Sequence, residues 1–234
     1  MYNTKSHEES TLLKTQQPLS SSRRNFLAKA GTATLASSVI FNACKKNDGY
    51  VFVGGGTDLG SGDIGILNYA YALEQLEAAF YIQVVKTPYS GMSTLETIYM
   101  NDIRDHEVAH REFFKAALGA SAIGNLSFNF SSVDFSNRTS VLGTAKSLED
   151  TGVMAYNGAG QLLVDAGYLL LAGKIVSVEA RHAALIRNLI SNNTFADDLD
   201  ANALDIAKSP TEVLKIASGF IVNASSIDAS HLPS

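Results

Sequence analysis

Residues 106–115 read HEVAHREFFK, and residues 178–187 read VEARHAALIR. Each stretch contains one Glu-x-x-His motif, formed by Glu107 with His110 and by Glu179 with His182. Two residues three positions apart lie on the same face of a helix, so both side chains of a motif can reach one point. The chain has only ten glutamates and five histidines, and chance predicts roughly a fifth of one such pair. Two pairs therefore indicate that the two helices share a function.

A lone glutamate lies in each of two further helical stretches. Glu74 lies in LEQLEAAFY and Glu149 in SLEDTGVMAY, on faces that are otherwise apolar. Tyr81 follows Glu74 by seven residues, and Tyr156 follows Glu149 by seven, which is two helical turns along the same face. The order of lone glutamate, tyrosine and Glu-x-x-His thus occurs twice, with 33 positions between the two glutamates in the first half and 30 in the second. This repeat indicates an internal duplication of function.

Helical patterns of apolar residues fill the chain after residue 62, and no strand-like alternation competes with them. Residues 120–135 lack such a pattern. Extended, these residues reach about 50 Å, against about 35 Å for a helix of the expected length. The sequence therefore predicts an all-α four-helix bundle of the ferritin-like kind, in which this stretch crosses the bundle between the second and third helices. The first expected helix spans about residues 63–85, with Asp63 as its cap. The next three span about 93–118, 136–164 and 168–191, and a short C-terminal helix follows over about 209–222.

The third expected helix contains four glycines, at positions 143, 152, 158 and 160. Each glycine costs about 1 kcal/mol relative to alanine in a helix interior. Either the helices pack very closely at these positions or the helix is interrupted, and the sequence leaves both explanations open.

Four glutamates and two histidines on core faces need a source of positive charge. A buried carboxylate without a partner costs several kcal/mol. Two divalent cations would balance four carboxylates, and two neutral imidazoles would complete the coordination without adding charge. Carboxylate and imidazole ligands suit iron or manganese. A single Glu-x-x-His motif is more often a pair of polar residues on a helix surface, but the complete repeated set favours a two-metal centre.

Four stretches carry a resemblance to known proteins: LEQLEAAFY, HEVAHREFF, SLEDTGVMAYNGA and VEARHAALIRNL. They resemble the ferritin-like di-metal carboxylate superfamily, which includes bacterioferritins, rubrerythrins and manganese catalases. Within it they look most like the exported ferritin-like domain family, which also contains plant desiccation-related proteins. The resemblance covers about residues 63–189 and includes all six ligand positions. It implies a ferritin-like bundle with a metal centre inside it.

The resemblance also implies a role for each residue. Glu74 and Glu149 would be terminal or bridging ligands, and the two Glu-x-x-His motifs would serve the two metals. Tyr81 and Tyr156 would form hydrogen bonds to ligand carboxylates. Glu77 could be a seventh ligand, as in peroxide-reducing relatives, although a place on the surface or behind the ligands is the favoured alternative. His106 is expected to be exposed, because adjacent helical residues point about 100° apart. The predicted metal ligands are Glu74, Glu107, His110, Glu149, Glu179 and His182.

The first 44 residues have the features of an export segment. Arg23 and Arg24 precede Phe26-Leu27, and a stretch of apolar and small residues follows over about 30–41. Such a segment resembles a twin-arginine signal. The only cysteine, Cys44, ends a relaxed lipobox and would carry the lipid. A plain cleaved signal with an incidental cysteine is the alternative. Residues 45–62, rich in Gly, Asp and Ser, are expected to form a flexible linker to a ferritin-like domain over 63–234.

These features predict an exported, membrane-anchored lipoprotein that faces the periplasm or the cell exterior. Its di-iron or di-manganese centre would serve redox chemistry with O₂ or peroxide, of the ferroxidase, peroxidase or catalase kind. A metal-binding or stress-protective module without turnover is the alternative. The net charge of −5 argues against nucleic acid as a partner. The expected partners are a membrane, reached through the lipid at Cys44, peroxide or O₂ as substrate, and a second copy of the chain in a homodimer.

Overall fold

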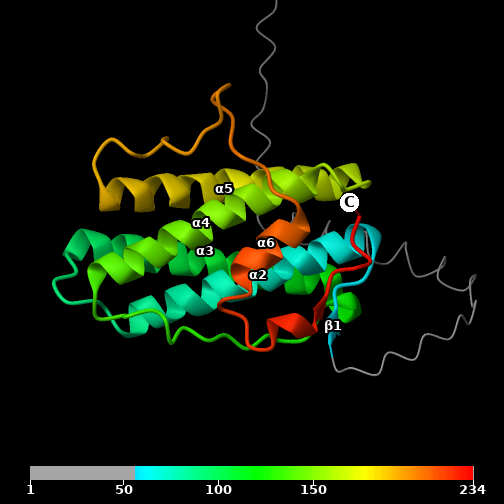
Figure 1. The fold of residues 1–234 in the computed structure, drawn as a ribbon, viewed down its shortest axis with the longest axis horizontal. Coiled ribbons are helices and arrows are strands. Elements are labelled where there is room, and N and C mark those ends of the chain that lie inside the picture. The colour runs from blue at the N-terminus through cyan, green and yellow to red at the C-terminus, as the bar shows by residue number, and fades with distance from the viewer. Residues whose placement is uncertain (1–55, 234) are drawn as a thin grey trace, which may run out of the picture. The chain divides into compact units, whose positions relative to one another are not determined.

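The computed structural model describes residues 56–233 of the chain, and four long helices dominate this part (Figure 1). The all-α four-helix bundle predicted from the sequence is confirmed. The only strands among the described residues are two short ones that pair with each other. The elements are β1 (Thr57–Asp58), α2 (Gly62–Lys86), α3 (Thr94–Leu118), η2 (Gly119–Ser121), α4 (Arg138–Gly160), α5 (Ala166–Ile190), α6 (Pro210–Ala217), η3 (Ala224–Ser226) and β2 (Ile227–Asp228).

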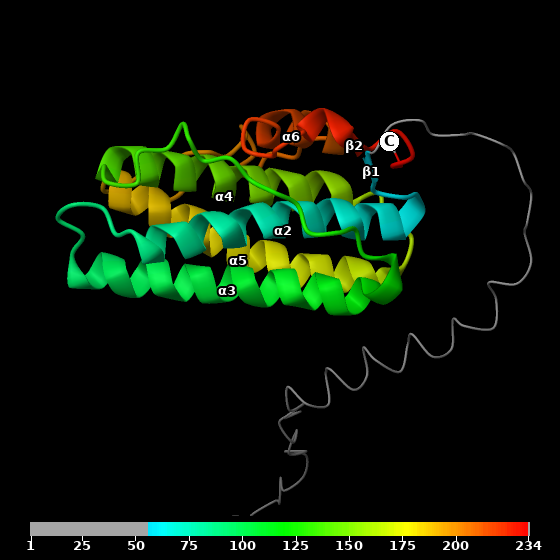
Figure 2. The ribbon, with the colours of Figure 1, turned by 90° about the horizontal axis from the view of Figure 1, so that it is seen from below.

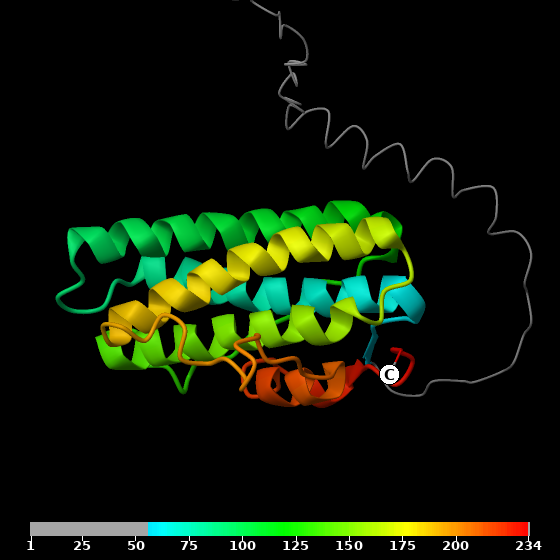
Figure 3. The same cartoon turned by 90° about the horizontal axis from the view of Figure 1, so that it is seen from above.

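Helix α2 is the most enclosed helix of the bundle. It packs against α3 and α4, while α4 packs against α5 and α6. The short helix α6 lies on the side of the bundle away from α3, as Figures 2 and 3 show from opposite directions. Every residue of α2 from Gly65 to Ala78 is buried. A helix enclosed on all sides needs apolar residues all round rather than along one stripe, which matches the sequence of α2.

The start of α3 follows the expected capping chemistry. The Ser93 hydroxyl accepts a hydrogen bond from the Glu96 backbone N–H at 3.1 Å, and Glu96 Oε2 accepts one from the Ser93 N–H at 2.9 Å. The prediction that Asp63 caps the first helix is wrong, because Asp63 lies inside α2. Its carboxylate instead accepts the backbone N–H groups of Val164 and Asp165, each at 2.8 Å. Asp63 therefore ties the start of α2 to the turn between α4 and α5.

Four helix ends differ from the prediction by two to five residues. Helix α4 begins at Arg138 instead of at 136, because Asn137 caps it. Helix α4 ends at Gly160, and α5 begins at Ala166 because Asp165 caps it, with Oδ1 accepting the Gly167 N–H at 2.7 Å. Helix α6 ends at Ala217 instead of near residue 222. There the chain leaves the helix because Ile221 forms an antiparallel bridge with the crossover segment. The end of α6 is therefore set by a contact distant in sequence, whereas the start of α5 is set by a cap in its own first turn.

The crossover between α3 and α4 runs the length of the bundle, as predicted (Figure 2). Phe128, Phe130 and Phe135 are partly buried and pack against the core. The ring of Phe80 in α2 lies 5.8 Å from that of Phe130 and 5.9 Å from that of Phe135, measured between centroids. These aromatic contacts hold the segment against the face of α2.

Helix α4 is continuous up to Gly160, its last residue, and close packing explains two of its four glycines. At Gly158, an added Cβ atom would lie 1.7 Å from the backbone oxygen of Lys208. At Gly152, it would lie 3.0 Å from Oε1 of Glu77. A Cβ at Gly143 would meet nothing within 4 Å. Glycine is therefore required at Gly158, where the backbone before α6 approaches α4, whereas a Cβ atom at Gly152 would fit only if the Glu77 side chain moved by a few tenths of an ångström.

The folded part begins earlier than residue 63. Thr57 and Asp58 pair in parallel with Ile227 and Asp228, and Leu59 is fully buried. The last residues of the expected linker over 45–62 therefore belong to the domain. The predicted export signal at Arg23 and Arg24, the lipidation site at Cys44 and most of the linker lie outside the described residues. Within residues 56–233, no helix combines the length and the apolar character that a membrane span needs.

Candidate metal centre

The structure brings the six predicted metal ligands together in the middle of the bundle. Each long helix contributes a glutamate, and α3 and α5 each add a histidine one turn later. The four glutamates have no exposed surface, and the two imidazoles are largely covered. The helical repeat of the sequence thus corresponds to two helix pairs, α2 with α3 and α4 with α5, that face each other across the cluster.

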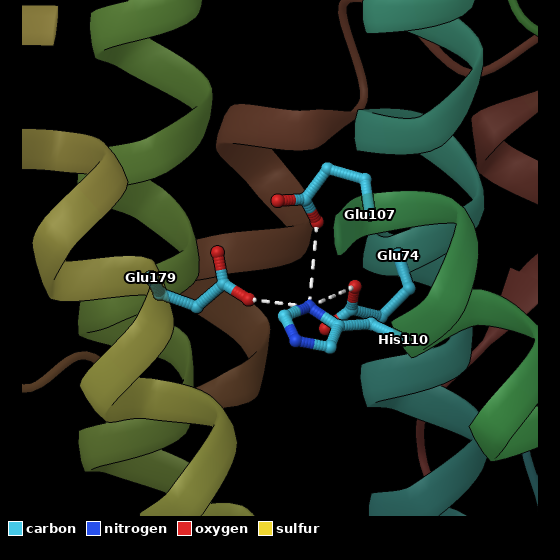
Figure 4. Close-up of side chains that lie close together, drawn as sticks. All are labelled: Glu74, Glu107, His110 and Glu179. Atoms are coloured by element: carbon cyan, nitrogen blue, oxygen red, sulfur yellow. Dashed lines mark ion pairs between the residues drawn. The ribbon is translucent and has the colours of Figure 1, made fainter. Parts of the chain in front are cut away.

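The first group of ligand atoms surrounds His110 (Figure 4). Its Nδ1 atom lies 2.9 Å from Glu179 Oε1, 3.4 Å from Glu74 Oε2 and 3.6 Å from Glu107 Oε2. These residues come from α2, α3 and α5, so three helices must be in register to form the group. Their ligand atoms all lie within 4.8 Å of one another, close enough to share one ion.

The second group surrounds His182 in the same manner. Its Nδ1 atom lies 2.8 Å from Glu107 Oε1, 3.4 Å from Glu149 Oε2 and 3.5 Å from Glu179 Oε2. Glu107 and Glu179 belong to both groups, and each offers one oxygen to each group. Glu74 and Glu149 belong to one group each. The sequence left terminal and bridging roles open, and this geometry makes Glu107 and Glu179 the shared carboxylates.

The ligand atoms converge without satisfying one another. Within residues 56–233, both imidazole Nδ1 atoms are buried without a hydrogen-bond partner, although carboxylate oxygens lie close to them. The same is true of six glutamate oxygens: Oε2 of Glu74, both of Glu107, Oε2 of Glu149 and both of Glu179. Buried polar atoms are rarely left unpaired, and each costs about 1–3 kcal/mol. A donor set of carboxylate oxygens and imidazole nitrogens fits divalent iron or manganese.

The electrostatics of the cluster favour positive charge. Burial disfavours the charged form of His182, yet the carboxylates of Glu149, Glu107 and Glu179 raise its pKa to about 12. The pKa of His110 is raised well above its usual range by neighbouring carboxylates in the same way. A pocket that attracts protons this strongly also attracts metal cations.

The four ligand carboxylates differ in the direction in which their surroundings shift their pKa. Burial and the negative charge of Glu179 raise the pKa of Glu107 to about 8. Burial also raises the pKa of Glu74 and Glu149. Glu179 is the exception, because His110 and His182 both lie beside it and lower its pKa to about 2 despite burial. Glu179 is therefore the carboxylate that stays charged most readily.

Two tyrosines hydrogen-bond to ligand carboxylates across the bundle. The hydroxyl of Tyr81, in α2, donates to Glu149 Oε1 of α4 at 2.5 Å. The hydroxyl of Tyr156, in α4, donates to Glu74 Oε1 of α2. Burial, followed by the charge of the glutamate, raises the pKa of both phenols well above the usual value, which keeps them protonated as donors. Each half of the repeat thus orients the lone glutamate of the other half.

Glu77 is buried beside the cluster, so a place on the surface is wrong for it. It lies one turn after Glu74 in α2, and its Oε1 occupies the space that Gly152 leaves open in α4. Its Oε2 is buried without a hydrogen-bond partner. Burial and the charges of the four ligand glutamates raise its pKa well above the usual value. Glu77 is therefore a fifth carboxyl group at the centre, held most easily in its neutral form.

His106 is a residue of this site that the sequence reasoning missed. It is exposed, as expected, but its ring stacks on that of His182 with centroids 5.1 Å apart. Its Nδ1 lies 2.9 Å from His182 Nε2. Burial and the neighbouring imidazoles lower the pKa of His106, which favours its neutral form. The signal in the sequence was the spacing of His106 and His110, because residues four apart share a helix face.

A further group of possible ligands lies at the surface, where Asp58 and Asp228 adjoin His231. His231 Nδ1 lies 3.5 Å from Asp58 Oδ1, and both side chains are more than half exposed. Exposed acidic groups are common without a metal, and we assign none here.

Comparison with known proteins agrees with this geometry. Residues 62–192 match the family described as ferritin-like domain. The chain belongs to this ferritin-like domain family. The match covers the four long helices and all six clustered ligands, so the buried cluster lies entirely within the matched residues. No curated protein matches the chain. The ferritin-like bundle and a buried Glu/His cluster compatible with a two-metal site are therefore established, and the chemistry at that site is inferred from its residues.

Proposed function

We propose that this ferritin-like protein binds two metal ions, iron or manganese, in the core of its bundle. The observation that carries the proposal is the pair of overlapping ligand groups that share Glu107 and Glu179. Glu74 and His110 would complete one metal position, and Glu149 and His182 the other. Two divalent ions would balance the negative charge of the four buried carboxylates, whose partners within residues 56–233 are otherwise the imidazoles of His110 and His182 and the hydroxyls of Tyr81 and Tyr156.

The surrounding residues would hold the ligands in place. Tyr81 and Tyr156 donate to Glu149 and Glu74 and so leave the second oxygen of each carboxylate facing the cluster. A metal bound at His182 Nδ1 requires the ring proton on Nε2, which can then donate to His106 Nδ1. Such outer hydrogen bonds fix the orientation of a ligand and typically change metal affinity by about 10–100-fold when removed.

We further propose that the centre serves redox chemistry with O₂ or peroxide, of the ferroxidase, peroxidase or catalase kind. Bound iron or manganese supplies the ability to change oxidation state. The protein contributes a core that shields the cluster, and Glu77 can hold a proton on its carboxyl group beside the ligands.

Export and anchoring are proposed from the sequence alone. The pair Arg23-Arg24, the apolar stretch after it and the single cysteine Cys44 support a lipoprotein of the exported ferritin-like type. The protein would face the periplasm or cell exterior, attached to a membrane and able to pair as a homodimer. Labelling with a radioactive fatty acid in cells tests the anchor: wild type should be labelled and Cys44→Ala should not.

Metal content tests the site directly. The purified protein is loaded with Mn²⁺ or anaerobic Fe²⁺, desalted and analysed for metal per chain. Wild type should hold two ions. Glu179→Gln removes charge from both ligand groups and should lose both ions, whereas Glu74→Gln should keep one. Glu112→Gln, a change of an exposed glutamate in α3, is the matched control and should keep two. A folded wild type without metal, or Glu179→Gln with two ions, contradicts the proposal.

Turnover separates the redox proposal from a metal-binding or stress-protective module. Fe²⁺-loaded protein is mixed with O₂ or with peroxide, and oxidation is followed by absorbance in a stopped-flow instrument. Oxidation faster than that of free Fe²⁺, and lost in Glu179→Gln, supports the redox role. Two bound ions that oxidise no faster than free iron favour the binding module.

A further inference from the structure

An apolar cavity of about 30 Å³ lies at the end of the bundle where α2 and α5 begin. Its wall consists only of Ile, Leu, Phe, Tyr, Ala and Gly residues from the four long helices and the turn after α4. Its inner wall includes buried residues such as Leu67, Phe114 and Ala159, while Ala117 and Ala172 on the outer side are partly exposed. The cavity therefore extends from near the surface into the core.

Tyr156 links this cavity to the metal centre. Its side chain lines the cavity, and its hydroxyl donates to Glu74. Leu73 and Ala70 of α2 also line it, and Ala70 precedes Glu74 by four residues, about 6 Å along the helix axis. The cavity thus ends about one helical turn from a ligand carboxylate.

The cavity exists because the two halves of the repeat differ in side-chain size. Helices α2 and α4 correspond with an offset of 75 residues, which relates Glu74 to Glu149, and α3 and α5 with an offset of 72, which relates Glu107 to Glu179. At the cavity, alanines occupy positions whose counterparts at the other end of the bundle are large and fully enclosed. The pairs are Ala155 with Phe80, Ala159 with Val84 and Ala172 with Met100.

The size and polarity of the cavity restrict what it can hold. By the same measure of volume, a single water needs about 10–15 Å³ together with two to four polar partners. Tyrosine hydroxyls are the only polar side-chain atoms in the wall; that of Tyr156 is already bonded to Glu74, and that of Tyr69 is buried without a hydrogen-bond partner within residues 56–233. The single buried hydroxyl of Tyr69 is fewer than the two to four polar partners that a water needs. An apolar cavity of this kind stays dry and takes small apolar molecules. Peroxide, which needs hydrogen bonds, and charged molecules are poor matches.

We propose that this cavity binds a small, uncharged, apolar molecule of the size of O₂ and leads it past Tyr156 to the metal centre. The binding site stands on its own geometry, whereas its use for O₂ rests on the redox function proposed above. It would make O₂, rather than peroxide, the oxidant that this end of the bundle admits.

Xenon binding tests the cavity without metal. The metal-free full chain is titrated with xenon and followed by ¹²⁹Xe NMR. Wild type should bind xenon, and filling the cavity by Ala117→Leu or Ala172→Leu should weaken binding at least about tenfold. Ala116→Leu, at the exposed neighbouring position of α3, is the matched control and should bind as wild type does. Thermal unfolding verifies that each variant is folded. Absent xenon binding in wild type, or equal binding in all variants, overturns the proposal.

Oxidation kinetics test the use of the cavity. In Fe²⁺-loaded protein, Ala117→Leu should slow oxidation by O₂ several-fold and leave oxidation by peroxide unchanged. Equal effects on both oxidants, or none on either, overturn the proposed O₂ path even when xenon binds. If wild type oxidises iron with neither reagent, the redox function fails and the O₂ path fails with it, while the xenon result still decides the binding site.

Discussion

Gly158→Ala tests the close approach between α4 and the chain before α6. The new Cβ atom would lie 1.7 Å from the Lys208 backbone oxygen and 2.6 Å from its carbonyl carbon. Since carbon contacts are optimal at about 3.5–4.0 Å, the segment must move by about 2 Å. That movement breaks the hydrogen bond from the Lys208 N–H to the Met154 oxygen, now 3.1 Å long. The lost bond costs about 1 kcal/mol and the overpacking about 1–3 kcal/mol.

Alanine also favours the helix by about 1 kcal/mol over glycine, so the net loss should be about 2 kcal/mol. For a domain of this size, that loss lowers the melting temperature by about 4–8 °C. Urea denaturation of the metal-free protein measures the free energy of unfolding, with an unchanged m-value as a check on two-state behaviour. The control is Gly143→Ala in the same helix, where the Cβ meets nothing within 4 Å, so stability should rise. A Gly158→Ala protein as stable as Gly143→Ala would refute the reasoning.

Three further changes probe the centre itself. Tyr156→Phe removes the donor to Glu74 and should weaken metal binding by about 10–100-fold in a calorimetric titration; unchanged affinity would mean that this bond does not orient the carboxylate. Burial raises the pKa of Glu77 above the ordinary value of 4.5, so the unfolded chain loses this proton first and metal-free wild type should become less stable as the pH rises through 4.5. Glu77→Gln should have the same free energy of unfolding as wild type near pH 4 and a larger one near pH 8. Denaturation at both pH values measures this difference, and a parallel decline in the two proteins would contradict it. His106→Ala removes the partner of His182 Nε2 and should weaken one of two metal-binding steps while sparing the other; equal weakening of both steps would argue against it.

Much of the fold could be predicted because its signals are local. The 3.6-residue period places Glu107 and His110 on one face whatever the helix packs against. Helix ends were less predictable where distant contacts determine them. Asp63 has the chemistry of a cap, but it is used by the turn before α5. Helix α6 stops early because Ile221 pairs with the crossover, a partner about ninety residues away in the chain.

The sequence by itself determined the four-helix bundle and the six residues of its centre, because helical spacing and the scarcity of glutamate and histidine are visible without a structure. Only the tertiary structure decided that Glu107 and Glu179 are shared by both ligand groups and that each tyrosine serves the opposite half. The same holds for the stacking of His106 on His182 and for the cavity beside Tyr156. These features depend on how far the helices are shifted and rotated against one another. Periodicity within one helix carries no information about that, because it defines a face but not the partner opposite it.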